Sequence, residues 1–239
     1  MTTTRAMAGV SLGPHRCFNL GAACGDAPER VARNRSLIEG ALELPASPHW
    51  LEQVHGCDVH DADAHADVAP ARAPPRADAA HTGVTGRVLA VLTADCLPIA
   101  LVTDDASHIA LVHAGWRGLC AGVLEACIAR LPVDPGRLRA WVGPAISAAR
   151  YEVGEEVREA FVRADPLSNA AFAVTRPGHW SCDLVELARR RLARAGIERV
   201  SGGDHCTYTD AERFYSYRRD GVTGRIATLA WLEDRPAFA

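Results

Sequence analysis

The sequence predicts one mixed-sheet α/β domain, layered like an α+β sandwich, that spans residues 1–239. Its composition, 48% hydrophobic and 23% charged, is that of an ordinary globular protein. Short β-branched runs joined both by helical stretches and by tight turns indicate a mixed sheet. No internal repeat divides the chain, and a chain of this length buries enough surface to fold without a structural metal. Any metal site is therefore free to serve catalysis.

Apolar runs rich in β-branched residues predict the strands of this sheet. They cover residues 88–93, 99–103, 109–112, 138–142 and 225–232. Residues 94–98 separate the first two runs and predict a tight interruption between two strands. The third run stops at His113, which is followed at once by glycine-bounded chain. His113 is therefore expected at the carboxyl end of a strand, where α/β folds place binding groups.

Three kinds of signal predict helices: an opening Pro-Glu pair at residues 28 and 29, acidic residues in the early turns of 153–162, and apolar spacing of three and four residues in the other two segments. They are expected at 28–42, at 119–131, at 153–162 and from Asp183 up to Gly196. Asp183 and Glu186 have the spacing of a capping box. Residues 62–80 are almost entirely Ala, Asp, Pro and Arg, which predicts an irregular surface connection.

Composition and charge exclude several classes of function. The net charge is −3, and all 26 basic residues are Arg, so a lysine Schiff base and a P-loop are excluded. The Arg residues are scattered, which argues against nucleic-acid binding. The sequence contains no secretory signal and no apolar run of 18 residues, so we expect a cytoplasmic protein without a membrane span. We expect a monomer or a weak homo-oligomer, with its eight cysteines mostly free thiols.

Three residues, His55, Cys96 and His113, are candidate ligands of one catalytic metal. Two imidazole nitrogens and one thiolate leave the fourth position of a zinc ion open for water or substrate. The separations of 41 and 17 residues match no local zinc signature.

A cysteine hydrolase would use the same residues without a metal. Cys96 would be its nucleophile and His113 its base, with Asp95 or Gln53 orienting the imidazole. The residues alone leave both interpretations open.

Ten segments, in order across nearly the whole chain, resemble the YfiH-like family. Its members are labelled laccase-domain or multicopper polyphenol oxidases and are also regarded as purine nucleoside phosphorylases. The combination of residues 93–98 (TADCLP) and 113–118 (HAGWRG) is the most specific part of the resemblance. The other segments are 9–11, 18–20, 34–35, 53–56, 143–146, 151–154, 206–207 and 216–219.

The resemblance implies that His55, Cys96 and His113 bind the metal and form the catalytic centre, with zinc usual and copper sometimes reported. It implies a compact α/β domain that cleaves adenosine, inosine, guanosine and methylthioadenosine with phosphate, and that also deaminates adenosine. Some members are instead described as hydrolases or as editing peptidoglycan precursors.

Candidate substrate contacts follow from the chemistry of a nucleoside and an anion. Arg35, Arg117 and Arg218 are candidates for phosphate, because a guanidinium suits that anion. A second set of residues is expected to position the nucleoside, and it consists of Asn19, Asp95 and Tyr217. The chain departs from the family pattern at His81, which either adds a donor near the site or fills space.

The pattern of histidines in the sequence argues against the laccase activity that the family name suggests. Multicopper oxidation needs an electron-transfer copper and a trinuclear cluster, and the cluster characteristically uses paired His-x-His ligands. No such pair occurs in the sequence. The sequence therefore favours purine chemistry over phenol oxidation.

Overall fold

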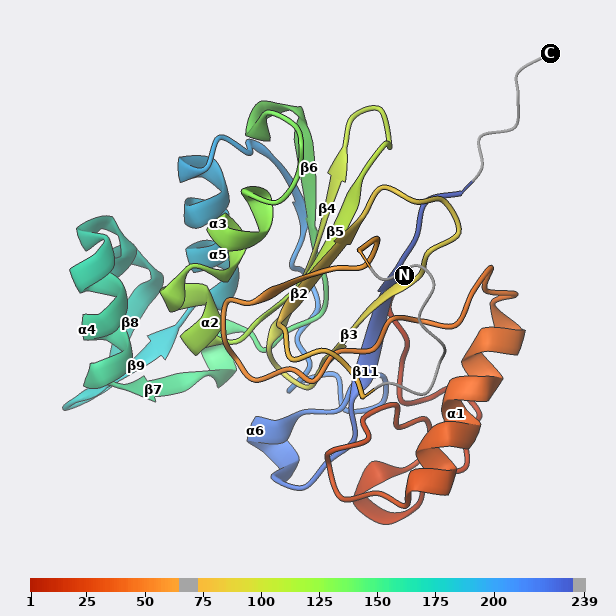
Figure 1. Cartoon of the computed structure of the whole chain (residues 1–239). Coiled ribbons are helices and arrows are strands. Elements are labelled where there is room, and N and C mark those ends of the chain that lie inside the picture. The colour runs from red at the N-terminus through yellow and green to blue at the C-terminus, as the bar shows by residue number, and fades with distance from the viewer. Residues whose placement is uncertain (65–72, 234–239) are drawn as a thin grey trace.

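A mixed six-stranded sheet forms the centre of the fold, seen in the computed structural model, which describes residues 1–64 and 73–233 (Figure 1). In sheet order its strands are β1 (Val59–Asp61), β2 (Ala79–Thr82), β5 (Ile109–Ala114), β4 (Leu97–Thr103), β6 (Leu138–Val142) and β10 (Arg199–Gly202). The two outer pairings are parallel and the three inner pairings are antiparallel. The mixed sheet that the sequence predicted is thus confirmed.

Two smaller sheets flank the central one. One is the antiparallel pair of β3 (Leu89–Thr93) and β11 (Ile226–Ala230). The other joins β7 (Glu152–Gly154), β9 (His179–Cys182) and β8 (Phe172–Arg176). The α-helices are α1 (Pro28–Ala41), α2 (Trp116–Ala121), α3 (Val123–Ile128), α4 (Glu155–Ala164), α5 (Leu184–Arg194) and α6 (Tyr217–Asp220). Short 3-10 helices occupy Gly13–His15, Pro135–Arg137, Ala148–Arg150 and Pro166–Ala171.

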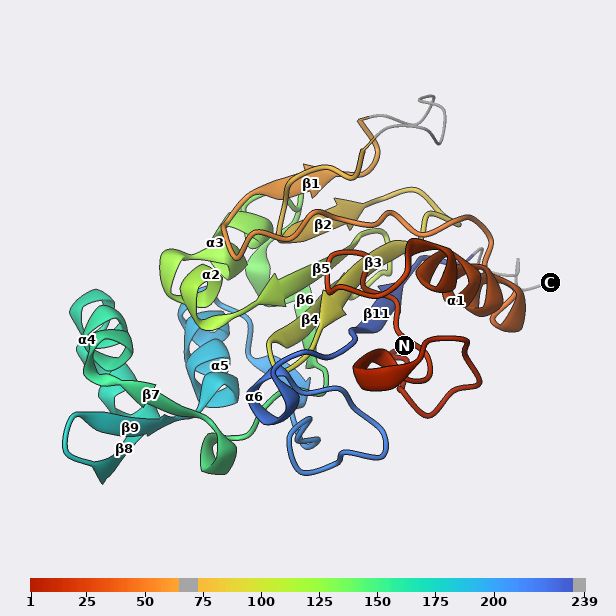
Figure 2. The same ribbon diagram turned by 90° about the horizontal axis from the view of Figure 1, so that it is seen from below.

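The layers follow from the alternation of side chains along each strand. Leu97, Ile99 and Leu101 of β4 share a core with α2, α3 and α5. The opposite face of the central sheet packs against Leu89 and Val91 of β3. The outer face of the β3–β11 pair is covered by α1 and the N-terminal segment (Figure 2). The result is one layered sandwich, as expected.

The helix predicted at 119–131 is divided into α2 and α3. Gly122, between them, has φ 104°, a left-handed conformation that ends α2 and that glycine adopts without a steric penalty. The capping box predicted at Asp183 is half formed: the Asp183 carboxylate accepts from the Glu186 amide, but the Glu186 side chain pairs with Arg190. The helix predicted at 153–162 begins two residues later, because 152–154 form β7.

The prediction of an irregular connection at 62–80 is wrong for its last two residues, 79 and 80. Residues 65–72 lie outside the described residues, but 79–82 form β2, and Asp78 and Ala79 are fully buried. Alanine carries a weak hydrophobic signal, yet its small side chain suits a strand packed closely between two layers. Sequence patterns also missed β1, β8, β9 and β10, which are short and mostly only half-buried or exposed.

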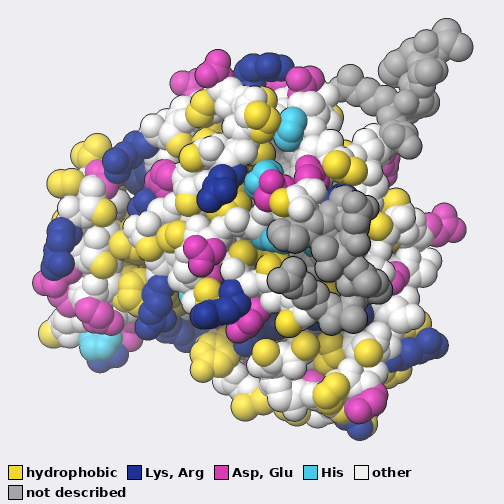
Figure 3. Space-filling model, in the orientation of Figure 1, with side chains coloured by type: hydrophobic (Ala, Val, Ile, Leu, Met, Phe, Trp, Pro, Cys, Tyr) yellow, Lys and Arg dark blue, Asp and Glu magenta, His cyan; other side chains and the backbone are white. Residues whose placement is uncertain are grey.

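Two further observations concern the helices and the surface. Within residues 1–64 and 73–233, no helix has both the length and the apolar character that crossing a membrane requires. On the face shown in Figure 3, acidic and Arg side chains are interspersed. That face has no stripe of one charge, which a nucleic-acid-binding surface would need.

Candidate metal centre

The β4–β5 hairpin brings Cys96 to His113. In the antiparallel register Pro98 lies opposite His113 and Leu97 lies opposite Ala114. Cys96 immediately precedes β4 and Gly115 immediately follows β5, so both lie at the same end of the hairpin. The separation of 17 residues between Cys96 and His113 is therefore a consequence of strand pairing.

His55 reaches this point from a loop that the Asp78 carboxylate holds. The backbone amides of Val54, His55 and Gly56 donate to that carboxylate at 3.2, 2.9 and 2.6 Å. His55 itself has φ 60°, an uncommon conformation for a residue other than glycine. Three hydrogen bonds from backbone N–H groups to one carboxylate fix the loop in this conformation.

The same carboxylate orients His113. Its Oδ1 lies 2.8 Å from His113 Nδ1, and both side chains are buried. With Nδ1 bound to Asp78, the Nε2 atom of His113 is the nitrogen left for a metal. Burial raises the pKa of Asp78, but its hydrogen bonds with His113, Gly56 and His55 outweigh burial and leave the pKa below its ordinary value. Asp78 is therefore a charged residue that orients the candidate ligands.

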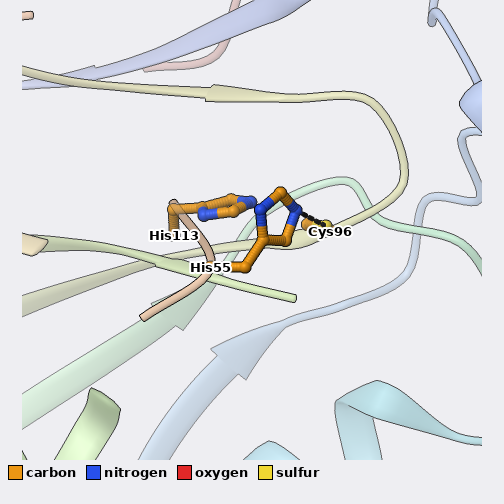
Figure 4. A group of neighbouring side chains, drawn as sticks. All are labelled: His55, Cys96 and His113. Carbon is orange, nitrogen blue, oxygen red and sulfur yellow. Dashed lines mark hydrogen bonds between the residues drawn. The ribbon is translucent and has the colours of Figure 1, made fainter. Parts of the chain in front are cut away.

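The three predicted ligands form one cluster (Figure 4). Their ligand atoms all lie within 4.8 Å of one another, and Cys96 Sγ is 3.9 Å from His55 Nε2. The two imidazole rings meet edge to face, with 4.8 Å between their centroids and 83° between their planes. Within the described residues this is the only such group of three or more His, Cys, Asp or Glu side chains.

The electrostatics of the cluster favour a thiolate. Burial raises the pKa of the Cys96 thiol, but the charge and hydrogen bonds of His113 and His55 outweigh it and lower the pKa to about 6. Burial lowers the pKa of His113, whereas the neighbouring Cys96 and Asp78 raise it to about 9. Without a metal, Cys96 and His113 thus form a thiolate–imidazolium pair. A metal held here would bind the thiolate and would replace the proton on Nε2 of His113, leaving a neutral imidazole.

The residues present fit a divalent metal. Bond lengths of about 2.0–2.3 Å in tetrahedral zinc sites imply ligand–ligand separations of roughly 3.3–3.7 Å, slightly shorter than those in the cluster. Gly115 forms one wall of the site, because a Cβ there would lie 2.9 Å from His55 Cδ2 and 3.0 Å from Cys96 Sγ. The donor set and the missing side chain leave room for three ligands to close on one ion.

Two predicted substrate contacts are bonded within the protein. Asn19 is fully buried, and its amide is bonded to Gly21, Asp26 and the Arg225 backbone. The Arg35 guanidinium donates to the Leu20 carbonyl and lies 3.9 Å above the Trp50 ring. Neither residue belongs to the cluster of three ligands, and their roles in substrate binding stay predictions.

Neither residue predicted to orient His113 does so. Asp95 is buried, and its carboxylate accepts from the Thr207 hydroxyl at 2.6 Å and from the Arg218 amide at 2.7 Å. Gln53 exchanges two hydrogen bonds with the backbone of Leu92. Asp95 instead ties the Cys96 turn to the C-terminal segment through both of its oxygens, and its role in positioning a nucleoside stays a prediction.

The remaining residues predicted to contact substrate differ in the interactions that their side chains make. The Tyr217 side chain is exposed. The Arg117 guanidinium lies 4.5 Å above its neighbour Trp116 and has no ion pair among the described residues. Arg218 is tied to Asp95 through its amide. His81 is half-buried in β2 and does not belong to the cluster of three ligands.

Sequence reasoning missed two residues of the candidate site, Asp78 and Gly115, and gave no role to Tyr151, whose ring lies beneath the Arg218 guanidinium. Asp78 stands in the low-complexity segment that was interpreted as surface, Gly115 carries no side chain, and Tyr151 follows a short 3-10 helix. The family segments contain Gly115 and Tyr151, and the departure at His81 directed attention to the segment that contains Asp78. None of these signals indicated a role.

The fold and the cluster together define a layered α/β protein whose described residues include a His-Cys-His cluster suited to hold a metal. The chain belongs to the family described as multi-copper polyphenol oxidoreductase laccase, whose model matches residues 1–233. This confirms the resemblance to YfiH-like proteins.

Relatives and solved structures agree with this membership. The chain is 51% identical to a Xylella fastidiosa (strain 9a5c) protein named purine nucleoside phosphorylase, over 97% of this chain and 91% of that protein. It is 48% identical to the Escherichia coli (strain K12) purine nucleoside phosphorylase YfiH, over 94% and 90% of the two chains. The crystal structure of Neisseria meningitidis NMB0706 matches with a TM-score of 0.91 at 42% identity, over 98% and 93% of the chains.

Replacing Gly115 with Ala is expected to weaken zinc binding at least tenfold, because the added methyl group would press on both His55 and Cys96. Zinc per chain after gel filtration and zinc competition with a chromogenic chelator measure the effect. Gly40→Ala is the matched control, because a Cβ at Gly40 meets nothing within 4 Å. Equal zinc affinity in the two variants would contradict the conclusion that the absence of a side chain at Gly115 leaves room for the ligands.

Replacing Asp78 with Asn is expected to lower zinc affinity by about 10- to 100-fold, since outer partners orient metal-bound histidines. The Asn amide cannot accept all four of the hydrogen bonds that the carboxylate receives. The same chelator competition measures the change. Asp58→Asn removes an exposed charge three residues from His55 and should leave zinc affinity within twofold of the parent protein. A comparable loss in both variants would mean that only net charge matters.

Proposed function

We propose that this protein is a zinc-dependent purine nucleoside phosphorylase. A phosphate oxygen attacks C1′ of adenosine, inosine, guanosine or methylthioadenosine, and the glycosidic electrons pass to the purine, which takes up a proton. The products are the free base and the 1-phosphate of the ribose or methylthioribose. We also propose adenosine deaminase activity, in which water replaces the 6-amino group and ammonia is released. The partners are thus a purine nucleoside and phosphate.

The observation that carries the proposal is the cluster of His55, Cys96 and His113, which supplies three ligands and leaves one position free. Zinc bound there would supply Lewis acidity toward water or a substrate oxygen. Asp78 holds two of the three ligands in place, so the site is built before substrate arrives. The names of the relatives from Xylella and Escherichia supply the reaction class.

Arg117 and Arg218 are the candidates for phosphate, and Tyr217 is the candidate for the nucleoside. Arg117 follows Gly115 by two residues, and Arg218 is anchored to the residue before Cys96. A guanidinium offers several donors in one plane, which suits phosphate oxygens.

Phenol oxidation by several coppers is a weaker candidate. An oxidase of that kind needs an electron-transfer copper and a trinuclear cluster. The residues that the structure describes contain one group of three ligands, and the sequence contains no His-x-His pair. Copper could occupy the same three ligands as zinc, but one such site does not amount to a multicopper centre.

A cysteine hydrolase remains the second candidate function, because Asp78, His113 and Cys96 are arranged as orienter, base and nucleophile. Such an enzyme would release base without phosphate or would act on another substrate class, including peptidoglycan precursors. His55 distinguishes the two proposals, since a Cys-His-Asp hydrolase does not need a second imidazole beside the thiol.

The test is to incubate zinc-loaded protein with inosine, with and without phosphate, and to measure hypoxanthine and ribose 1-phosphate. We expect phosphate-dependent release by the parent protein. Cys96→Ala removes one metal ligand, so both bound zinc and activity should fall at least 100-fold. Cys17→Ala replaces an exposed cysteine and serves as the control, with both quantities unchanged.

Hypoxanthine release that does not require phosphate would favour the hydrolase. Retained zinc and near-normal phosphorolysis in Cys96→Ala would refute the ligand assignment. Ammonia release from adenosine, measured in the same preparations, tests the deaminase activity separately.

A further inference from the structure

Tyr151 has a free hydroxyl close to the metal centre. The residue lies between the 3-10 helix Ala148–Arg150 and β7, and its half-buried ring packs against the main core. Its hydroxyl makes no hydrogen bond with any residue that the structure describes. A phenol that is partly withdrawn from water and lacks a protein partner is suited to bind a ligand.

A chain of contacts connects Tyr151 to Cys96. The Arg218 guanidinium lies 4.8 Å from the centre of the Tyr151 ring. The backbone amide of Arg218 donates to the carboxylate of Asp95, the residue before Cys96. Burial raises the pKa of Tyr151; the neighbouring Cys182, Cys96 and Asp95 raise it further, and Arg218 lowers it by less. The hydroxyl therefore keeps its proton and acts as a donor.

Arg218 is positioned before any ligand binds. Its Nη1 donates to the Glu152 carbonyl, and its plane is supported by the Tyr151 ring. The Nε and Nη2 atoms of Arg218 have no partner among the described residues. Because the side chain is exposed, these two atoms are free to donate to a ligand. Arg117, the other candidate, stacks on its own neighbour Trp116, and no hydrogen bond or ion pair among the described residues links its side chain to the Cys96 turn.

We propose that Tyr151 and Arg218 together bind the phosphate of the reaction, with donors from Nε and Nη2 of Arg218 and from the Tyr151 hydroxyl. This inference rests on the proposed phosphorylase function. It assigns Tyr151 as a substrate-binding residue and selects Arg218 over Arg117 for phosphate. Phosphate oxygens are separated by about 2.5 Å, so one phosphate can accept from a guanidinium and a nearby hydroxyl at once.

The experiment is steady-state phosphorolysis by zinc-loaded Tyr151→Phe, with phosphate and inosine varied in turn. Phenylalanine keeps the ring beneath Arg218 and removes only the hydroxyl. The KM for phosphate should rise about tenfold or more, because a hydrogen bond to a charged group is lost. The KM for inosine and the zinc content should stay within twofold of the parent protein. A merely structural role would not separate the two KM values.

Tyr208→Phe is the matched control, because Tyr208 also lies beneath an arginine, Arg150, at 5.4 Å. It should leave both KM values unchanged. An unchanged phosphate KM in Tyr151→Phe, or an equal rise in Tyr208→Phe, would overturn the inference while leaving the phosphorylase proposal intact. A parent protein without phosphorolysis would refute the proposed function itself.

Arg218→Lys provides a second test if Tyr151→Phe folds poorly. Lysine keeps the positive charge but lacks the planar fork, so the KM for phosphate should again rise several-fold while the KM for inosine changes little. Unchanged phosphate KM in this variant would also overturn the inference.

Discussion

The buried carboxylate of Asp78 is the interaction on which the metal centre depends. A charge without exposure to water is tolerable only when its hydrogen bonds are satisfied, and Asp78 accepts three backbone amides and one imidazole N–H. Because these donors come from both the His55 loop and β5, one acceptor fixes two ligands relative to each other. The left-handed backbone at His55 persists because this acceptor compensates its cost.

The third ligand is fixed by a different means. Cys96 owes its place to the register of β4 and β5, which is set by the alternation of side chains between two buried faces. A shift of that register by one residue would reverse both faces, so the position of Cys96 relative to His113 is as rigid as the core itself. Asp95 strengthens the turn by bonding Thr207 and Arg218 from the C-terminal segment. The site therefore combines a rigid hairpin with one loop that depends on Asp78.

Much of the fold and part of the site could be predicted from sequence. The strands of the hairpin are apolar runs and α5 has a strong apolar stripe, whereas α1 was predicted from its opening Pro-Glu pair. The motifs around His55, Cys96 and His113 predicted three candidate ligands, which the fold brings together. Asp78 could not be recognised, because its importance arises from donors far away in the chain and its neighbours resemble loop. The motifs of Asn19 and Arg35 match the family but do not reveal how the two side chains are bonded: Asn19 donates to Asp26, and Arg35 donates to the Leu20 carbonyl.

Charge explains why the proposed phosphorylase would need a phosphate-binding residue beside a metal held by the cluster. A divalent ion would bring two positive charges, whereas the Cys96 thiolate and the carboxylates of Asp78 and Asp95 bring three negative ones. Only neutral hydroxyl and amide donors and one imidazole contact these carboxylates. The metal alone therefore leaves its surroundings unfavourable for an anion, since these charges act at short range and are poorly screened by salt. An arginine anchored beside Asp95 offsets that excess, and it does so on the side of the site from which Cys96 is presented.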